Sequence, residues 1–265
     1  MIHAVITPLK LWIARIAALV VLLIASGIAC AGDAQAQPQA RPAAKPVEAV
    51  YLPITDVPGL PRVLIIGDSV SCGYTLPLRT ALTGVANVHR PPQNCGSSAV
   101  GLQNLDRWLG NQPWDVIHFN YGLHDLSCEF SPGKNRNAAG DYARPDNGGH
   151  HRVAPDAYRA NLTALVERLR AKAPTATLIF VTTTPVSADL HHYVKDDEVE
   201  YNRTAVEVMT AHGVHVNDLW AFAKPRIAEI QEPGNPHFTA TGSQILAAGI
   251  ADVIRGALTA RQERQ

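Results

Sequence analysis

A serine near the start of the chain and a histidine near its end are the side chains best suited to chemistry. Ser69 lies in Gly67-Asp68-Ser69, directly after the apolar run 63–66, and His237 precedes the last predicted helix. A serine hydroxyl that passes its proton to a histidine can attack a carbonyl carbon, and backbone N–H groups can stabilise the resulting oxyanion. Gly-Asp-Ser could equally be a helix N-cap, because Ser and Asp are both good caps.

Short apolar runs alternate with amphipathic stretches from residue 62 onward, which predicts an α/β fold. We expect a three-layer α/β/α sandwich with a central five-stranded parallel sheet. The predicted strands are Arg62–Gly67, Ala86–His89, Asp115–Asn120, Ala176–Thr183 and Val214–Asn217. The predicted helices are Leu76–Leu82, Ala99–Leu109, Pro155–Ala173, Asp197–His212 and Ala240–Ala260. One long polar connection, 126–154, remains, and such loops in compact domains are usually functional or mobile.

The predicted topology brings the reactive residues together. Right-handed crossovers make all strands point the same way, so the loops that follow them gather at one edge of the sheet. Ser69 follows the first strand, Asn94–Ser98 the second, Gly122–Asp125 the third, and His237 the last. Small residues in the second of these loops leave room for a free backbone N–H. We therefore expect Ser69 and His237 to meet at this edge.

From Arg62 to about Ala260 the chain resembles the SGNH (GDSL-type) hydrolases. Gly67-Asp68-Ser69 matches the family's nucleophile block, Gly96 its glycine block and His237 the histidine of its last block. Gly122-x-His124-Asp125 occupies the Gly-x-Asn-Asp block. The resemblance implies a flavodoxin-like fold, Ser69 as nucleophile, His237 as base, and the N–H groups of Ser69 and Gly96 as oxyanion donors. The absence of Gly-x-Ser-x-Gly argues against the ordinary α/β-hydrolase fold.

Two positions depart from the pattern of this family. His124 stands where the family has an asparagine as third oxyanion donor, and a neutral imidazole still offers one N–H. Gly234 stands where the family has an aspartate, three residues before the histidine, and Asn235 is two before it. His237 is therefore oriented by Asn235 or a backbone carbonyl, by a carboxylate such as Glu232, or by nothing, as in a Ser–His dyad. We favour Asn235 or a carbonyl.

Polar and aromatic residues of the same loops are candidates for substrate binding. Tyr121 and Tyr193 could stack on a sugar ring, and we expect Asp125 to brace its own loop. The candidates are Asp68, Asn94, Tyr121, Asp125 and Tyr193. The pairs His150-His151 and His191-His192 could line a substrate rim. They match no zinc signature, so we predict neither a metal nor a cofactor.

The first 60 residues are typical of a targeting segment and a tether. Residues 1–36 combine a basic start, an apolar middle and small-residue cleavage sites, which predicts a signal peptide. Residues 37–60 are rich in Ala and Pro and predict a flexible linker, which leaves 61–265 as the hydrolase domain. We expect a periplasmic or secreted protein. Lipid attachment at Cys30 is one alternative, and a retained membrane anchor is another, although the apolar run is short for a span.

Export implies an oxidising compartment, in which disulfides persist. Cys95 and Cys128 flank the two loops that the resemblance assigns to the oxyanion hole, so a Cys95–Cys128 bridge would hold the donors in place. Cys72 would then be a buried free thiol. The alternative is three buried free thiols.

These observations predict an exported serine esterase that removes O-acyl groups, most simply acetyl, from a small-molecule or polysaccharide ester. A lysophospholipase or thioesterase is the alternative within the family, although no long apolar lid segment favours a lipid. A catalytically weak carbohydrate-binding protein and an anchored scaffold are alternatives from other classes. The 23 basic and 23 acidic residues give no net charge and no support for a nucleic-acid partner. We expect a monomer.

Overall fold

The computed structural model describes residues 48–187 and 190–264. Five parallel strands form one sheet in the order β2-β1-β3-β6-β7. The strands are β1 (Arg62–Ile66), β2 (Asn87–His89), β3 (Val116–Phe119), β6 (Thr177–Val181) and β7 (His215–Asn217). All five predicted strands are present, and the predicted fold class is confirmed.

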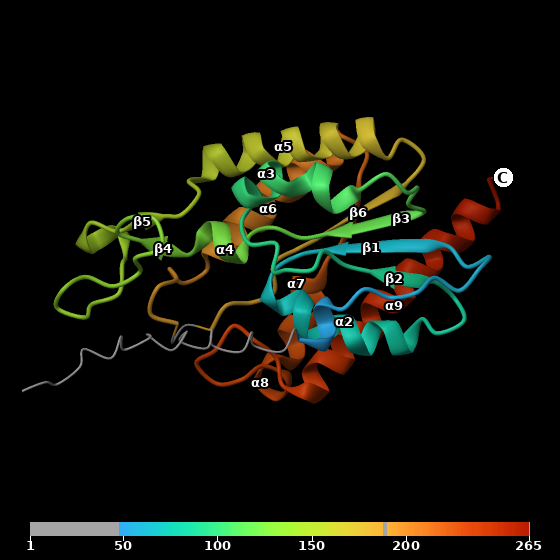
Figure 1. Cartoon of the computed structure of the whole chain (residues 1–265). Helices are drawn as coiled ribbons and strands as arrows, with labels where there is room; N and C mark the ends of the chain where they lie inside the picture. The colour runs from blue at the N-terminus through green and yellow to red at the C-terminus, as the bar shows by residue number, and fades with distance from the viewer. Residues whose placement is uncertain (1–47, 188–189, 265) are drawn as a thin grey trace, which may run out of the picture. The chain divides into compact units, whose positions relative to one another are not determined.

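Helices cover both faces of the sheet (Figure 1). On one face lie α3 (Ser98–Leu109), α5 (Pro155–Lys172) and α6 (Asp197–Ala211), with α5 packed on both of the others. On the other face α2 (Ser69–Ala81) packs along α9 (Ala240–Gln262). The chain thus forms the three layers that the sequence pattern predicts.

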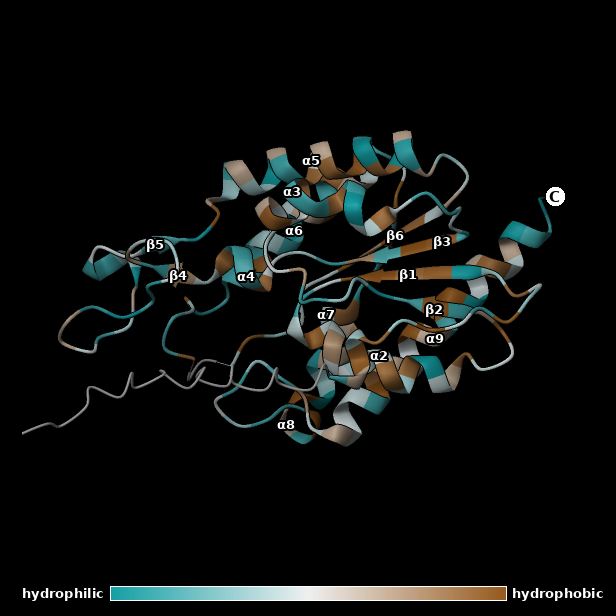
Figure 2. Cartoon of the chain, viewed as in Figure 1, coloured by the Kyte–Doolittle hydropathy of each residue, from teal (hydrophilic) through white to brown (hydrophobic). Residues whose placement is uncertain are grey.

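The sheet is buried on both sides, which explains why its strands are continuous apolar runs. Along β1, Leu64 and Ile66 face the α3, α5 and α6 layer, whereas Val63 and Ile65 face α2 and α9. Successive side chains of a strand point to opposite faces, so each strand contributes to both cores. Figure 2 shows the apolar residues on the strands and on the helix faces turned toward them.

Helix α2 begins at Ser69, seven residues before the predicted start at Leu76. The Asp68 side chain caps the helix by accepting a hydrogen bond from the Val70 N–H at 2.9 Å. This cap is the N-cap reading of Gly-Asp-Ser, and it coexists with an active-site position for Ser69. Asp68 is therefore the N-cap of α2, and its cap fixes Ser69 as the first residue of the helix.

The long connection after β3 carries small elements that the sequence pattern does not predict. It begins at the end of α4 (Leu123–Leu126) and contains an antiparallel hairpin of β4 (Cys128–Glu129) and β5 (His150–His151), with a 3-10 helix at Pro145–Asn147 between the two strands. The hairpin lies beyond α4, on the side where β3 ends (Figure 1). The remaining elements are short helices: Ala49–Tyr51, α7 (Leu219–Ala223), Lys224–Arg226 and α8 (Ile227–Ile230).

The predicted signal peptide, Cys30 and linker residues 37–47 lie outside the described residues. The rest of the predicted linker contacts the domain: Val50 is buried, Tyr51 Oη lies 3.3 Å from Cys72 Sγ, and the Val57 N–H donates to Asn87 Oδ1 at 2.8 Å. Residues 48–60 are thus held by the domain, because these contacts replace the freedom expected of a tether. Among the described helices, none has the length and hydropathy that a membrane span requires.

The predicted Cys95–Cys128 disulfide is wrong for this structure. Cys72, Cys95 and Cys128, the cysteines within the described residues, are all free thiols. Cys95 is held just after β1, where its backbone N–H donates to Gly67 O at 3.2 Å. Cys128 belongs to the β4–β5 hairpin, and its backbone N–H donates to His192 O at 2.8 Å. Burial raises the pKa of Cys95 to about 12 and that of Cys128 to about 11, which favours the unreactive thiol form.

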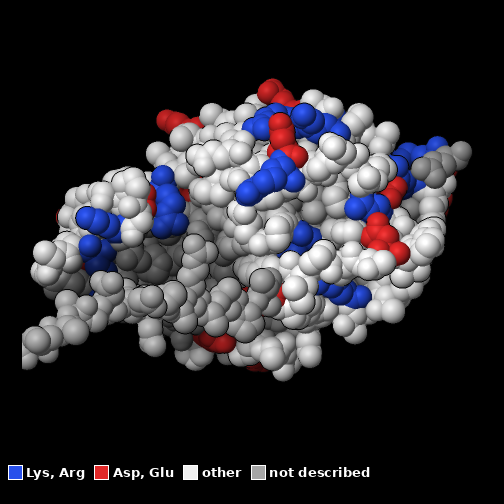
Figure 3. All heavy atoms as spheres, viewed as in Figure 1, with Lys and Arg blue, Asp and Glu red and all other residues white. Residues whose placement is uncertain are grey.

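Basic and acidic side chains are interspersed on the face of the molecule that Figure 3 shows. Some oppositely charged side chains pair across neighbouring helices, as Arg159 does with Glu207 at 2.5 Å. Exposed pairs of this kind contribute little to stability. The mixed charge of this face agrees with the overall charge balance of the sequence.

Candidate active site

Ser69 lies at the amino end of α2, immediately after β1. The first-turn N–H groups of a helix have no partners within the helix, so the Ser69 amide is available beside its own hydroxyl. Ser71 Oγ donates to Asp68 O at 2.6 Å and holds the turn from below. The local structure therefore presents a hydroxyl and a backbone N–H at the positive end of a helix.

His237 lies in the loop that connects α8 to α9. Gln231 and Phe238 form a β-bridge across this loop, and the Glu232 N–H donates to His237 O at 3.0 Å. Thr239 then caps α9 by accepting from the Gly242 N–H at 3.0 Å. These bonds hold the imidazole so that its Nε2 lies 2.8 Å from Ser69 Oγ. Ser69 and His237 therefore meet, as we expected from the predicted topology.

Asn235 is the residue that orients His237. Its Oδ1 lies 2.6 Å from His237 Nδ1 and also accepts the His237 backbone N–H at 3.0 Å. Its Nδ2 donates to Glu232 Oε2 at 2.7 Å. Of the arrangements left open by the sequence, the structure contains Asn235 on the imidazole, with Glu232 behind the amide and not on the histidine.

This network sets the proton positions on the histidine. The carboxylate of Glu232 only accepts hydrogen bonds, so the Asn235 amide must turn its NH₂ toward Glu232 and its oxygen toward His237. Neutral His237 then carries its proton on Nδ1 and keeps the Nε2 lone pair for the proton of Ser69. This is the tautomer that a general base for serine requires.

The Gly96 N–H, the second predicted oxyanion donor, lies in the loop after β2. It donates to Asn94 Oδ1 at 2.9 Å, in an Asx turn within this loop. Asn94, a predicted substrate-binding residue, is therefore a partner of the Gly96 amide. A substrate oxyanion has to share or replace this hydrogen bond.

His124 lies in α4, and its Nδ1 is 3.3 Å from Arg152 Nη1. Burial lowers the pKa of His124; the nearby cation of Arg152 and the ring of His237 lower it further, and only Asp68 raises it. His124 is therefore a neutral imidazole within electrostatic range of the Ser69 loop. Arg152 was not among the predicted site residues, because the long connection that carries it has no periodic pattern.

Asp125 holds its own loop in place, as predicted, and its buried side chain is not placed to bind substrate. Its side chain is fully buried and accepts from the Ser98 backbone N–H at 2.9 Å, which joins α4 to the start of α3. Asn161 Nδ2 donates to Ser98 Oγ at 2.9 Å and extends the contact to α5. Burial raises the pKa of Asp125 to about 7, although the Ser98 hydrogen bonds oppose this shift.

The predictions that Tyr121 and Tyr193 bind substrate are not supported. Tyr121 is 1% exposed, and its ring packs so closely on Gly101 of α3 that a Cβ there would overlap the phenol. Tyr193 is 8% exposed and packs beside His192, with ring centroids 4.4 Å apart. Both rings are thus part of the protein interior, and neither presents a face on which a sugar can stack.

The histidines of the two predicted pairs pack against aromatic and acidic side chains of neighbouring segments. His191 and His192 stack on the Tyr142 ring, with centroids 5.2 and 5.6 Å away. His151 Nε2 lies 2.6 Å from Asp197 Oδ2, which ties β5 to the start of α6. These contacts link the long connection to the segment after β6.

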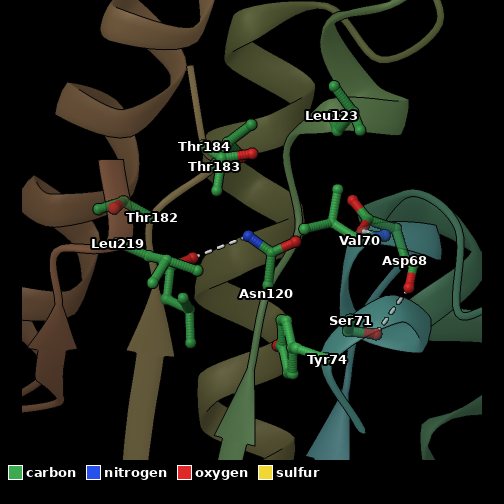
Figure 4. A pocket seen from close by; sticks show the side chains of 11 residues that line it. Asp68, Val70, Ser71, Tyr74, Asn120, Leu123, Thr182, Thr183, Thr184 and Leu219 are labelled. Atoms are coloured by element: carbon green, nitrogen blue, oxygen red, sulfur yellow. Dashed lines mark hydrogen bonds between the residues drawn. The ribbon is translucent and has the colours of Figure 1, made fainter. Parts of the chain in front are cut away.

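A small pocket lies at the carboxyl ends of β1, β3 and β6; Asp68 and Val70, the chain neighbours of Ser69, line it, but Ser69 and His237 do not (Figure 4). Asn120, which follows β3, donates from Nδ2 to Val181 O at 2.8 Å and closes its floor. This is the edge where the strand order reverses, the usual ligand site of such sheets. The residues labelled in Figure 4 are Asp68, Val70, Ser71, Tyr74, Asn120, Leu123, Thr182, Thr183, Thr184 and Leu219.

A model of the GDSL-like lipase/acylhydrolase family matches residues 65–245, more than half of the chain. The matched range contains Ser69, Asn235 and His237. The chain belongs to this family. It is an ester-bond hydrolase, and the resemblance inferred from the sequence is confirmed.

Solved structures of low sequence identity share the fold. A lipase/acylhydrolase from Enterococcus faecalis is 18% identical with a TM-score of 0.58, and the match covers 74% of this chain and 96% of that one. An acetylxylan esterase from Geobacillus stearothermophilus is 15% identical with a TM-score of 0.56, over 73% and 94% of the two chains. A second acetyl xylan esterase is 13% identical with a TM-score of 0.55, over 73% and 99%. The comparison with curated proteins found no match.

Proposed function

We propose that this hydrolase is a serine esterase with Ser69 as nucleophile and His237 as general base. The observation that carries the proposal is the 2.8 Å contact between Ser69 Oγ and His237 Nε2, with Asn235 on the other ring nitrogen. Ser69 Oγ attacks the ester carbonyl carbon while His237 takes its proton, and the imidazolium returns that proton to the leaving alcohol. Water, activated by the same histidine, then releases the acid from the acyl-enzyme and restores Ser69.

Three N–H groups stabilise the oxyanion in this proposal: the backbone amides of Ser69 and Gly96 and the imidazole of His124. The Ser69 amide belongs to the amino end of α2, whose dipole favours negative charge. The Gly96 amide is held by Asn94 in the absence of substrate. His124 substitutes for the asparagine of the family.

We further propose that the substrate is an O-acetyl ester on a carbohydrate and that the protein acts outside the cytoplasm. The polar long connection favours a hydrophilic alcohol. Two of the solved structures with this fold are acetyl xylan esterases. The signal-like segment at residues 1–36 supports export, and the reaction as written needs no cofactor.

A substrate panel tests this proposal. We expect wild type to hydrolyse p-nitrophenyl acetate and acetylated xylan and to lose rate as the acyl chain lengthens, with Ser69→Ala inactive on all of them. Preference for a lysophospholipid or an acyl thioester would replace the carbohydrate ester with the corresponding alternative. Equal rates for wild type and Ser69→Ala, together with binding of the glycan, would favour a carbohydrate-binding protein and contradict the esterase.

A further inference from the structure

An arginine from outside the catalytic loops contacts the histidine that replaces the asparagine of the family. Arg152 directly follows β5, and its Nη1 lies 3.3 Å from His124 Nδ1. A guanidinium is protonated at all relevant pH values and has no acceptor atom. In this contact the arginine therefore donates, and His124 Nδ1 accepts.

The guanidinium is anchored on its other side. Arg152 Nε donates to Glu129 Oε2 at 3.2 Å, and the same carboxylate oxygen accepts the Gly133 N–H at 3.0 Å. Glu129 is 4% exposed and belongs to β4, the strand paired with β5. The Arg152 N–H also donates to Ser127 O at 2.9 Å. The hairpin thus holds the arginine in place against His124.

The consequence for His124 is a defined tautomer. Since Nδ1 accepts a hydrogen bond, the proton of the neutral ring is on Nε2. No hydrogen bond among the described residues uses that Nε2, so its N–H is free to meet a ligand. The charged and titratable groups near the ring are Asp68, Arg152, His192 and His237, and the fixed positive charge of Arg152 disfavours a second proton on His124.

Tautomer choice matters for a histidine in a way that it does not for asparagine. The carboxamide of an asparagine always offers two N–H donors, whereas a neutral imidazole nitrogen offers either an N–H or a lone pair. A lone pair aimed at the oxyanion would repel it. A histidine at this position therefore needs a partner that keeps the proton on the nitrogen facing the reaction.

We propose that Arg152, held by Glu129, is a positioning residue that keeps His124 as the Nε2–H tautomer and so makes it an oxyanion donor. The inference rests on the proposed esterase function. It assigns a role to the β4–β5 hairpin, which holds Arg152. Arg152 and His124 together supply the N–H donor that a single asparagine supplies elsewhere in the family.

A double-variant cycle tests the proposal. We expect Arg152→Met to lower kcat on p-nitrophenyl acetate by roughly 10-fold or more, up to the ~10²–10³-fold that loss of a whole oxyanion donor costs. In a His124→Asn background, where no tautomer has to be chosen, Arg152→Met should change kcat by less than about threefold. Arg159→Met, which removes an exposed Arg–Glu pair between α5 and α6, is the matched control and should leave kcat unchanged.

A loss of the same size in both backgrounds would show that Arg152 only braces the hairpin, and it would overturn the proposal. No loss in the wild-type background would also overturn it. Thermal unfolding of each variant separates a misfolded protein from a catalytic defect. If Arg152→Met does not fold, Arg152→Gln, whose amide can still donate to Nδ1, should fold and keep most of the activity.

Imidazole ¹⁵N NMR of the labelled protein gives a readout that does not depend on activity. We expect the wild-type spectrum to show His124 as a neutral ring with a protonated Nε2 and an unprotonated Nδ1, and Arg152→Met to lose this single state. A protonated Nδ1 in wild type would overturn the proposal even if the esterase activity is present. The expected spectrum from an inactive protein would instead contradict the proposed function and leave the tautomer assignment standing.

Discussion

Replacing Asn235 with aspartate is a direct test of the network behind His237. The substitution places a carboxylate on the His237 Nδ1–H, where the amide oxygen is now 2.6 Å away. It also removes the NH₂ group that donates to Glu232 Oε2 at 2.7 Å and brings two carboxylates together. Two adjacent carboxylates repel each other, so the new negative charge beside His237 is disfavoured. We therefore expect Asn235→Asp alone to stay within about threefold of the wild-type kcat.

An increase in kcat should appear once the repulsion between the carboxylates at positions 235 and 232 is removed. A carboxylate about 4 Å from an imidazolium contributes between about 1 kcal/mol in water and about 4 kcal/mol near a protein surface. The Asn235–His237 contact is part-buried, so a value between these two limits applies. A stabilisation of about 1–2 kcal/mol corresponds to a roughly 5- to 30-fold increase in kcat. We expect this increase in the double variant Asn235→Asp with Glu232→Gln.

The assay is kcat on p-nitrophenyl acetate for wild type, both single variants and the double variant. Glu232→Gln alone is the control, and it should change kcat little because a glutamine can still accept from Asn235. A single Asn235→Asp variant as fast as the double variant would refute the reasoning, since Glu232 would then not act on this position. A double variant slower than wild type would refute the view that the amide is a weaker partner for His237 than a carboxylate.

Three further predictions concern the surroundings of the site. Because burial raises the pKa of Asp125 to about 7, while an unfolded aspartate titrates near ~4, the free energy of unfolding should fall between these values as pH rises and then level off. Asp125→Asn keeps an acceptor for Ser98 and should flatten this slope in denaturation curves at about pH 5 and about pH 8; an unchanged slope would contradict the assignment. Gly122→Ala would drive a Cβ into Thr183 Oγ1, and we expect it to lower the free energy of unfolding by roughly 1–3 kcal/mol. Gly133→Ala, also at positive φ but with no neighbour near its Cβ, is the control, and an equal loss would point to backbone strain alone. Alkylation and peptide mass mapping of unreduced, denatured protein should find Cys95 and Cys128 both labelled; a linked peptide pair would restore the disulfide.

The sheet and the meeting of Ser69 with His237 could be predicted because both follow from simple patterns. Strands buried on both faces are continuous apolar runs, and parallel strands bring their following loops to one edge. The start of α2 was harder to predict, since Gly73 and Pro77 lie within the helix and obscure it. The Asp68 cap, and not the interior of the helix, sets its first residue.

Other parts of the site depend on side-chain geometry that sequence patterns do not contain. Asn120 faces the pocket, whereas Tyr121 points into the core, because successive side chains at the end of β3 alternate. Because the two residues are adjacent in the chain, the sequence pattern does not show which of them faces the pocket and which faces the core. Arg152 was missed since the connection that carries it has no helical or strand period. The partner of His237 had to stay open because Asn235 and Glu232 are both within reach along the chain.

Covalent trapping tests the central claim most directly. A fluorophosphonate reacts with a serine that a neighbouring base activates, and peptide mass spectrometry locates the adduct. The account predicts one phosphonyl group per chain, on the peptide that contains Ser69, formed much more slowly in His237→Ala. An adduct on a different residue, or no adduct in a folded protein that still hydrolyses p-nitrophenyl acetate, would contradict it.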